Sequence, residues 1–392
     1  MAATMTTGRP QTHVTRWARD LATHLPHLST AERTALALWS YAATVTEHIG
    51  QTTCAAARTS VRALATALTE PENTLRQRLR EFYRPAEHKR GPHRRDLDVR
   101  LSFGPLLCWA LWLLRPREVV LALDPTLCRD RLAVLVVAVV VHGCAVPVAW
   151  KAVVANEPGA WMPHWQPMLA RLAASIPART RVVVVTDRGL QSRDLFAEIV
   201  ALGWHPLMRL TRNGTWRGRG ETSWTPLRAL PVAPGEYSIA QGELFSTFRH
   251  RCTLVVVWRR GFDEPWLLMT DLPPARCERA FYGLRSWIEQ GFRALKSGGL
   301  RCERLRITDP ERAERVWLVL SVSLLWTHAV GATPEASERL VDGVRRVLGV
   351  HRRGWVRLLG ALARGVGLPL PRRSRWPSPP TRTLAEMVRP PT

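Results

Sequence analysis

Three consecutive runs of mostly apolar residues mark the middle of the chain. The first two, EVVLALD ending at Asp124 and LAVLVVAVVV starting at Leu132, are almost continuous in apolar residues, which is typical of strands covered on both faces. The run AVPVAWKAVV follows directly. RVVVVTD and HPLMRL come later, with helix-like stretches before and between them. Three strands followed by alternating helices and strands predict an α/β domain.

The residues before this domain, 1 to about 115, follow the helical period instead. Ser29 and Glu32 have the spacing of a helix-capping pair. Apolar residues within 61–68 and 75–82 form two stripes separated by Pro71. The second stripe belongs to a helix with three arginines: Arg76, Arg78 and Arg80. Two short helices with a basic second member are typical of a helix-turn-helix DNA reader, but an ordinary amphipathic pair has the same pattern, so both interpretations stay open.

The second half of the chain changes character twice. Residues from about 211 to 275 are rich in Gly, Pro and Trp between short β-type runs, which indicates a β insertion. Helical patterns return at about 278–297 and 310–330. The last residues form a basic, Pro/Arg-rich tail, a composition that favours disorder.

The charge balance narrows the choice of partner. The chain has 56 basic and 32 acidic residues and a formal net charge of +24. Such a charge favours binding to nucleic acid, although an arginine bias from a GC-rich genome would also raise it. The seven cysteines include no C-x-x-C pair, so neither a zinc site nor a disulfide framework is expected. The apolar runs are too short to cross a bilayer. We therefore expect a cytoplasmic protein without a membrane partner.

Two aspartates follow apolar runs at equivalent places. Asp124 closes EVVLAL, and Asp187 closes RVVVVT. If the two strands are parallel neighbours, both carboxylates meet at the ligand-binding edge of the sheet. Carboxylates held close together repel each other unless a cation lies between them, and hard oxygen ligands suit Mg²⁺. The alternative is that both aspartates only cap turns, where Asp is common.

A third acid lies in the segment FYGLRSWIEQGFRALKSGGL. Four residues of this segment fall on one stripe of a helix: Tyr282, Arg285, Glu289 and Lys296. A separate apolar stripe can dock on a sheet. The stripe is compatible with an ordinary solvated face stabilised by ion pairs. It also supplies the third carboxylate and the phosphate-binding cations that a two-metal phosphoryl-transfer site needs.

These motifs together resemble those of bacterial insertion-sequence transposases of the DDE class. The spacing of Tyr282, Arg285, Glu289 and Lys296 is similar to the Tyr-Arg-Glu-Lys signature of one group of that class. LALDPT and VVTDRGL resemble the segments that carry the first two acids. EPWLLMTDLPP resembles a strand of the insertion whose Trp stacks against DNA, here Trp266. The resemblance covers residues 117 to 330, and the N-terminal helices weakly.

The resemblance implies a ribonuclease-H-like catalytic domain, a mixed sheet with flanking helices, interrupted by a β insertion. The expected organisation is a helical DNA-binding domain (1–115), the first part of the catalytic core (116–210), the β insertion (211–275), the second part of the core with the Glu289 helix (276–332), and a helical C-terminal region with the basic tail (333–392).

The resemblance also implies the activity. Asp124, Asp187 and Glu289 would hold two Mg²⁺ ions, with Mn²⁺ as a substitute, for cut-and-paste transposition through a hairpin intermediate. Expected partners are double-stranded DNA, both terminal inverted repeats and target, and a second copy of the chain on paired ends, at the bacterial nucleoid. DNA contacts are expected from Tyr282, Arg285, Lys296, Trp266, Arg76, Arg78 and Arg80. For Arg188, DNA contact and pairing with a carboxylate stay open.

Two other functions fit part of this pattern. A ribonuclease-H-like nuclease or resolvase shares the carboxylates but does not explain Trp266 and the flanking Tyr282 and Lys296. A catalytically silent DNA-binding protein derived from a transposase would not need all three acids.

Overall fold

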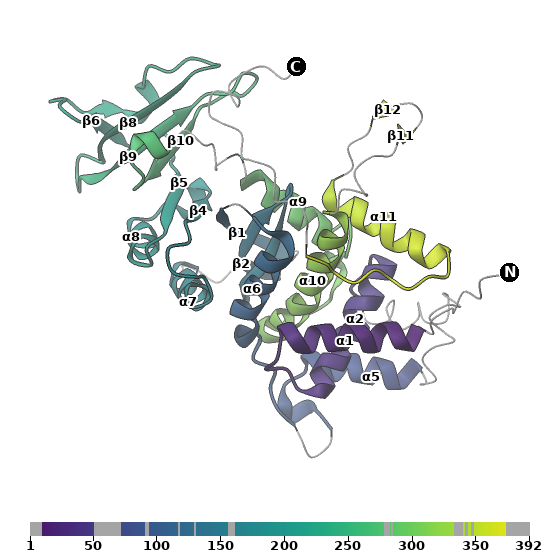
Figure 1. Cartoon of the computed structure of the whole chain (residues 1–392). Coiled ribbons are helices and arrows are strands. Elements are labelled where there is room, and N and C mark those ends of the chain that lie inside the picture. The colour runs from purple at the N-terminus through teal and green to yellow at the C-terminus, as the bar shows by residue number, and fades with distance from the viewer. Residues whose placement is uncertain are drawn as a thin grey trace.

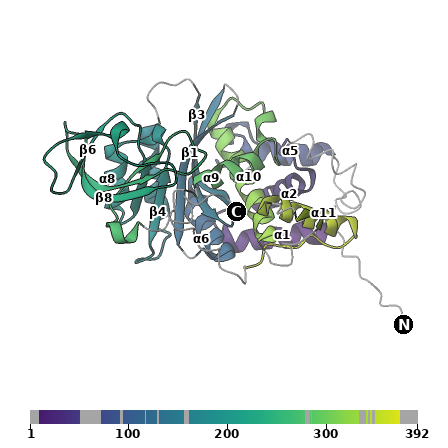
Figure 2. The same ribbon diagram turned by 90° about the horizontal axis from the view of Figure 1, so that it is seen from above.

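The structure is a computed structural model that describes residues 10–50, 72–90, 94–116, 118–128, 131–155, 161–277, 283, 285–332, 340–341, 344–345 and 349–373. A long mixed sheet runs through the molecule (Figure 1). Helices gather around one end of this sheet, and β6 and β8 lie at the other end (Figure 2).

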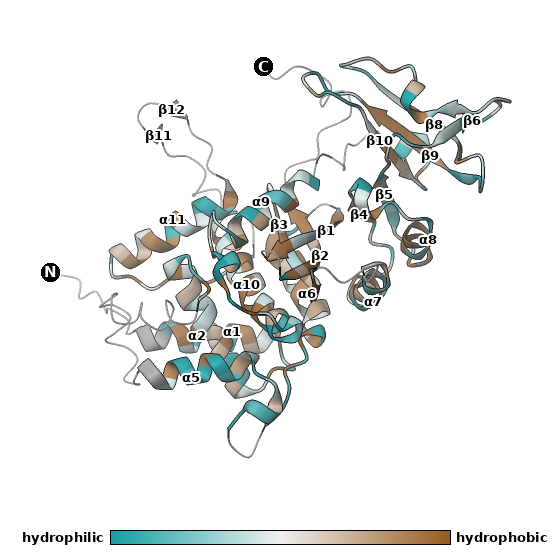
Figure 3. Ribbon diagram, turned by 180° about the vertical axis from the view of Figure 1, so that it is seen from behind, coloured by the Kyte–Doolittle hydropathy of each residue, from teal (hydrophilic) through white to brown (hydrophobic). Residues whose placement is uncertain are grey.

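The sheet has ten strands in the order β3-β2-β1-β4-β5-β10-β9-β8-β6-β7. Their bounds are β1 Val119–Cys128, β2 Leu132–Val141, β3 Cys144–Val154, β4 Val182–Thr186, β5 His205–Arg209, β6 Thr215–Gly218, β7 Thr225–Pro226, β8 Tyr237–Leu244, β9 His250–Val257 and β10 Trp266–Thr270. The five strands predicted from the apolar runs are therefore confirmed as β1 to β5. Every residue of β2 is buried, and the strands around β2 are coloured largely hydrophobic in Figure 3, as expected for strands covered on both faces.

Strand β1 pairs with β4 in parallel and with β2 in antiparallel fashion. The predicted parallel neighbourhood of the two strands that precede the aspartates is confirmed. The predicted end of β1 is wrong, however. Pairing with β4 stops at Leu123, but β1 continues beside β2 as far as Cys128. Asp124 therefore lies within a strand, at the point where one of its two neighbours ends.

The strands within residues 211–275 continue the main sheet rather than forming a separate one. Strand β10 pairs with β5 on one side and with β9 on the other, and β8 and β6 extend the sheet outward. The predicted strands of this region are present. Its status as an insertion into a catalytic core stays a prediction.

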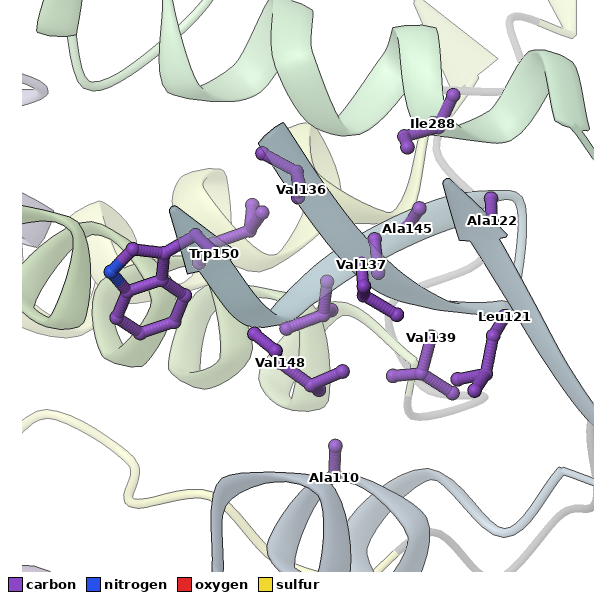
Figure 4. Packing of buried hydrophobic residues seen from close by; sticks show 14 of the residues in the cluster. Ala110, Leu121, Ala122, Val136, Val137, Val139, Ala145, Val148, Trp150 and Ile288 are labelled. Carbon is purple, nitrogen blue, oxygen red and sulfur yellow. The ribbon is translucent and has the colours of Figure 1, made fainter. Parts of the chain in front are cut away.

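Helices cover both faces of the sheet near β1 to β3. Ile288 of α9 (Ser286–Leu295) points at one face, and Ala110 of α6 (Phe103–Leu114) lies at the other (Figure 4). Helices α7 (Met162–Ala173) and α8 (Arg193–Ala201) pack beside β2, β3 and β5. Helix α10 (Pro310–Gly331) is buried almost all round, which is typical of a helix inside a large core.

The free edge of the sheet is protected by α10. Strand β3 is the outermost strand at this end, and the Ala152 amide of β3 donates to Oε1 of Glu314 on α10, at 3.1 Å. Lys151 Nζ lies 2.9 Å from the same oxygen. An edge strand with unpaired amides is a template for aggregation, so this contact both satisfies the amide and closes the edge.

The N-terminal helices share the hydrophobic core of the sheet domain. They are α1 (Pro10–His24), α2 (Thr30–Thr46) and α5 (Glu72–Tyr83). Trp17 of α1 packs against Trp326 of α10 with ring centroids 4.6 Å apart and the rings tilted by 33°, and its Nε1 donates to Ser40 Oγ at 2.9 Å. The predicted capping pair is confirmed, because Ser29 and Glu32 hydrogen-bond each other reciprocally.

The predicted helix-turn-helix is described in part. Its first helix, within 61–68, lies outside the described residues. Its second helix is α5, whose predicted apolar stripe is buried: Leu75, Leu79 and Phe82. Helix α5 packs against α2 and α10.

Helix α11 (Val350–Ala363) packs on α10, while most of the Pro/Arg-rich tail lies outside the described residues. No helix in the described ranges is long and apolar enough to cross a membrane.

The seat of α9 on the sheet depends on Gly291. A methyl group added at this position would overlap the backbone carbonyl oxygen of Ala145 on β3. Gly360, on α11, faces only the end of the flexible Arg364 side chain, 3.2 Å from an added Cβ. The same Gly→Ala exchange therefore meets rigid backbone at one site and a movable side chain at the other.

We expect Gly291→Ala to lower the free energy of unfolding by about 1–3 kcal/mol, since overpacking outweighs the gain of about 1 kcal/mol in helix propensity. Gly360→Ala is the control and should raise stability by about 0.5–1 kcal/mol. Chemical unfolding of both variants followed by circular dichroism measures this. Equal stabilisation by both exchanges would mean that α9 does not need this close approach.

Candidate active site

Two aspartates lie side by side at the carboxyl ends of the paired segments of β1 and β4, because these two strands run parallel. This end of the parallel strands is called the sheet edge that carries the site. Leu123 and Thr186 form the last parallel pair, and Asp124 and Asp187 come next on each strand. Asp187 then caps a short 3-10 helix, Arg188–Leu190, and its Oδ1 accepts from the Arg188 amide at 2.8 Å. The predicted convergence of the two carboxylates is therefore built by strand register.

Helix α9 brings a third carboxylate to the same place. Its apolar residues Ile288 and Leu295 are buried, and the helix packs on β3, β2 and β1. Glu289 lies in the first turn, on the other side of the helix, with 63% of its side chain exposed. Docking of the apolar stripe therefore fixes the direction in which the acid is presented.

One guanidinium group connects all three acids. Nη2 of Arg285 donates to Asp124 Oδ2 at 2.9 Å and lies 3.3 Å from Asp187 Oδ2. Nη1 donates to Glu289 Oε1 at 3.1 Å. The side chains of Arg285 and Asp124 are both only 14% exposed, and that of Asp187 is 31% exposed. One positive charge is thus shared by three negative charges at the edge of a buried sheet.

The excess of negative charge at the site affects the pKa of Asp124. Burial, opposed by the positive charge of Arg285 and reinforced by the negative charges of Asp187 and Glu289, raises the pKa of Asp124 to about 6. The carboxylates therefore favour more positive charge than Arg285 supplies.

The donor set suits a divalent metal ion. Three carboxylates around one cationic group are hard oxygen ligands of the kind that Mg²⁺ and Mn²⁺ take. The guanidinium of Arg285 is itself a cation that contacts all three carboxylates. In the part of the chain that the structure describes, no three His, Cys, Asp or Glu side chains lie close enough together to hold a metal. Metal ligation would therefore require the three carboxylates to approach one another, with Arg285 displaced from between them.

A second basic group, not predicted from the sequence, borders the site. Arg209 ends β5, the next parallel strand, and its Nη1 lies 3.8 Å from Asp187 Oδ1. Its Nη2 donates to Glu264 Oε1 at 3.0 Å, and Arg188 Nη1 donates to the same oxygen at 3.1 Å. Of the two interpretations of Arg188, the structure contains the ion pair, and DNA contact stays a prediction. Arg209 could have been found by applying the strand-end rule to all three parallel strands.

Trp266 lies at the same edge as the carboxylates. It is the first residue of β10, which runs antiparallel to β5, and it follows Glu264 by two residues. Its ring is partly buried, with Phe262 edge-on at 6.1 Å between centroids and Arg259 Cζ 5.7 Å from its centroid. The aromatic side chain is thus positioned beside the site by the sheet itself.

The other predicted residues are placed differently. Helix α9 ends at Leu295, so the predicted helical stripe does not extend to Lys296. The Lys296 charge acts on the thiols of Cys128 and Cys302. Tyr282 lies outside the described residues. Three of the predicted arginines belong to α5, which packs on α2 and α10: Arg76, Arg78 and Arg80.

One family model matches part of the chain. Residues 163–326 match the family model for the transposase DDE domain. The matched segment is less than half of the chain; it contains Asp187 and Glu289 and begins after Asp124. Residues 163–326 are therefore similar to the DDE domain of transposases.

Among solved structures, the chain is similar to the cryo-EM structure of a piggyBac transposase synaptic complex with hairpin DNA. The sequence identity is 11% and the TM-score 0.41, and the alignment covers 90% of this chain and 78% of that chain. No curated protein matches the sequence.

The raised pKa of Asp124 means that the charged form of this carboxylate lowers the free energy of unfolding. Because the folded-state pKa of this acid, about 6, lies above its ordinary value of 3.8, the protein loses stability as the pH rises through that interval. Asp124→Asn has no charge to bury. In metal-free buffer the variant should match the wild type at about pH 4 and exceed it by about 1–3 kcal/mol at about pH 7. Unfolding by urea at both pH values measures the difference. A variant less stable than the wild type at neutral pH would mean that the hydrogen bond to Arg285 outweighs burial.

Proposed function

We propose that this protein is a DNA transposase that cleaves transposon ends and joins them to target DNA with Asp124, Asp187 and Glu289. The observation that carries the proposal is the convergence of these three carboxylates on one guanidinium. The match of residues 163–326 to the transposase DDE domain supports it.

The sheet supports a ribonuclease-H-like catalytic core. Strands β1 to β5 lie in the order β3-β2-β1-β4-β5, with β2 antiparallel and β1, β4 and β5 parallel. In this arrangement the ends of β1 and β4 meet at one edge, where ligands of α/β sheets bind. Residues 211–275 would then be an insertion that extends the core sheet, and the N-terminal helices a DNA-binding region.

The proposed cofactor is a pair of Mg²⁺ ions, with Mn²⁺ as a substitute. Such ions stabilise the developing charge on the attacking and leaving oxygens of a phosphate diester. The three carboxylates would hold the ions at the sheet edge. Arg285 and Arg209 would bind phosphate oxygens nearby, because a guanidinium presents a fork of donors that matches phosphate.

The proposed partners are DNA and a second copy of the chain. The net charge of +24 favours duplex binding through phosphate contacts, and base-specific binding is assigned to α5. Trp266 would stack on a base that leaves the duplex when a hairpin forms at the transposon end. Two protomers would act on paired ends, at the bacterial nucleoid.

Neutral substitutions of the triad test the site. Asp124→Asn, Asp187→Asn and Glu289→Gln should each reduce cleavage and strand transfer roughly a hundredfold or more, because several kcal/mol of transition-state stabilisation depend on the ions. Duplex binding should persist, since no positive charge is removed. Gel assays of cleavage and of binding separate the two effects.

The matched control is Asp271→Asn. Asp271 also follows a strand of the same sheet, but β10 is antiparallel to β5, so it lies at the opposite edge, where it pairs with His205 at 2.9 Å. This variant should cleave normally. Near-normal strand transfer by any of the three triad variants would remove that residue from the site.

Trp266→Ala tests the stacking role separately. Base–aromatic stacking contributes about 1–3 kcal/mol, so hairpin formation should slow by roughly fivefold to a hundredfold, with first-strand nicking almost unchanged. Trp112→Ala, on α6, is the control because that tryptophan is 46% exposed and its ring contacts His24 of α1. Equal slowing of nicking and hairpin formation, or loss of folded protein, would favour a packing role for Trp266.

A further inference from the structure

Arg285 and a metal ion compete for the same atoms. Its guanidinium contacts one oxygen of each acid, at 2.9 Å (Asp124), 3.3 Å (Asp187) and 3.1 Å (Glu289). A divalent ion binds carboxylate oxygens at about 2.0–2.6 Å and uses the same lone pairs. A guanidinium held in the middle of such a ligand set would also repel the ion. The carboxylates can therefore hold Arg285 or metal ions, but not both in this arrangement.

Displacing Arg285 requires another anion for its charge. Its side chain is only 14% exposed, and an arginine that leaves three carboxylates without a new partner loses charge-assisted hydrogen bonds. The phosphate diesters of DNA match the guanidinium fork, and they arrive at the same sheet edge when the substrate binds. The exchange of partners then neutralises a phosphate and frees the carboxylates in one movement.

We infer that Arg285 is a positioning residue that couples metal loading to DNA binding: it closes the carboxylate site in the DNA-free protein and moves to a DNA phosphate when the substrate arrives. This inference rests on the proposed function. It means that the DNA-free chain binds divalent ions weakly and that DNA raises the affinity. By linkage, metal ions strengthen DNA binding by the same factor.

The test measures Mn²⁺ binding by isothermal titration calorimetry on the full chain without DNA. Arg285→Gln should raise the Mn²⁺ affinity roughly tenfold or more, which is within the usual range of coupling between sites. Arg285→Lys keeps the charge but cannot reach three acids at once, so its affinity should lie between those of the wild type and Arg285→Gln. Melting curves establish that each variant is folded, and the lysine variant decides the matter if the glutamine variant is not.

Two controls separate occupancy from mere loss of charge. Arg209→Gln removes a cation that lies 3.8 Å from a single acid, Asp187, and Arg293→Gln removes an exposed cation from the same helix, α9. Both should raise the Mn²⁺ affinity by much less than Arg285→Gln. An equal rise in Arg209→Gln and Arg285→Gln, or no rise in Arg285→Gln, would overturn the inference.

A second arm adds duplex DNA with blocked 3′ ends, with the binding of Mn²⁺ by DNA alone subtracted. DNA should raise the affinity of the wild type and change that of Arg285→Gln little. A wild type that does not respond to DNA would contradict the exchange.

The double variant Asp124→Asn/Arg285→Gln distinguishes this inference from the proposed function. If it loses the gained affinity, the metal binds at the carboxylates. If it keeps the gain, the ion binds elsewhere, and both the proposed metal site and the exchange at it fail. Persistent tight binding by the wild type that is lost in Asp124→Asn would leave the proposed function standing and overturn the exchange alone.

Discussion

The parallel pairing of β1 with β4 is the contact on which the site depends. It places Asp124, within β1, beside Asp187, the residue that follows β4, because Leu123 and Thr186 form the last parallel pair. The cost is visible in the raised pKa of Asp124. The fold tolerates this cost because the strands behind the acids are completely buried, so their hydrophobic stabilisation is large compared with the penalty of one carboxylate.

Helix α9 completes the site: one of its sides packs on the sheet, and another carries the third acid. One side packs closely enough on β3 that residue 291 has no room for a side chain, while the other presents Glu289 next to Arg285. Close packing limits how far the acid can shift. The exposed first turn leaves room for the charged groups to change partners. One side of this short helix is thus held rigidly by the sheet, while charged groups on another side have room to change partners.

Much of this arrangement could be predicted from the sequence. The apolar runs predicted β1 to β5, because buried strands leave a continuous hydrophobic signal. The end of β1 was predicted wrongly, since Asp124 interrupts the apolar run although the backbone continues to pair with β2. Helical periodicity correctly placed Glu289 on a helix, but it predicted that this helix extends beyond Leu295, where the observed helix ends. Arg209 was missed because its relevance comes from strand order, which periodicity does not encode. The bridging role of Arg285 depends on side-chain distances, which spacing alone does not give.

The continuity of the ten-stranded sheet restricts how this protein can be divided or rebuilt. Strand β10 is hydrogen-bonded to β5 and β9 at once, so excision of the outer strands would expose β5 as a bare edge beside the carboxylates. An exposed edge of that kind invites pairing with other chains. We therefore expect that strands β6 to β10 cannot be exchanged between related proteins, or expressed alone, as an independent unit. Any engineered change in this region has to preserve the hydrogen-bond ladder between β10 and β5, because β5 ends beside the carboxylates.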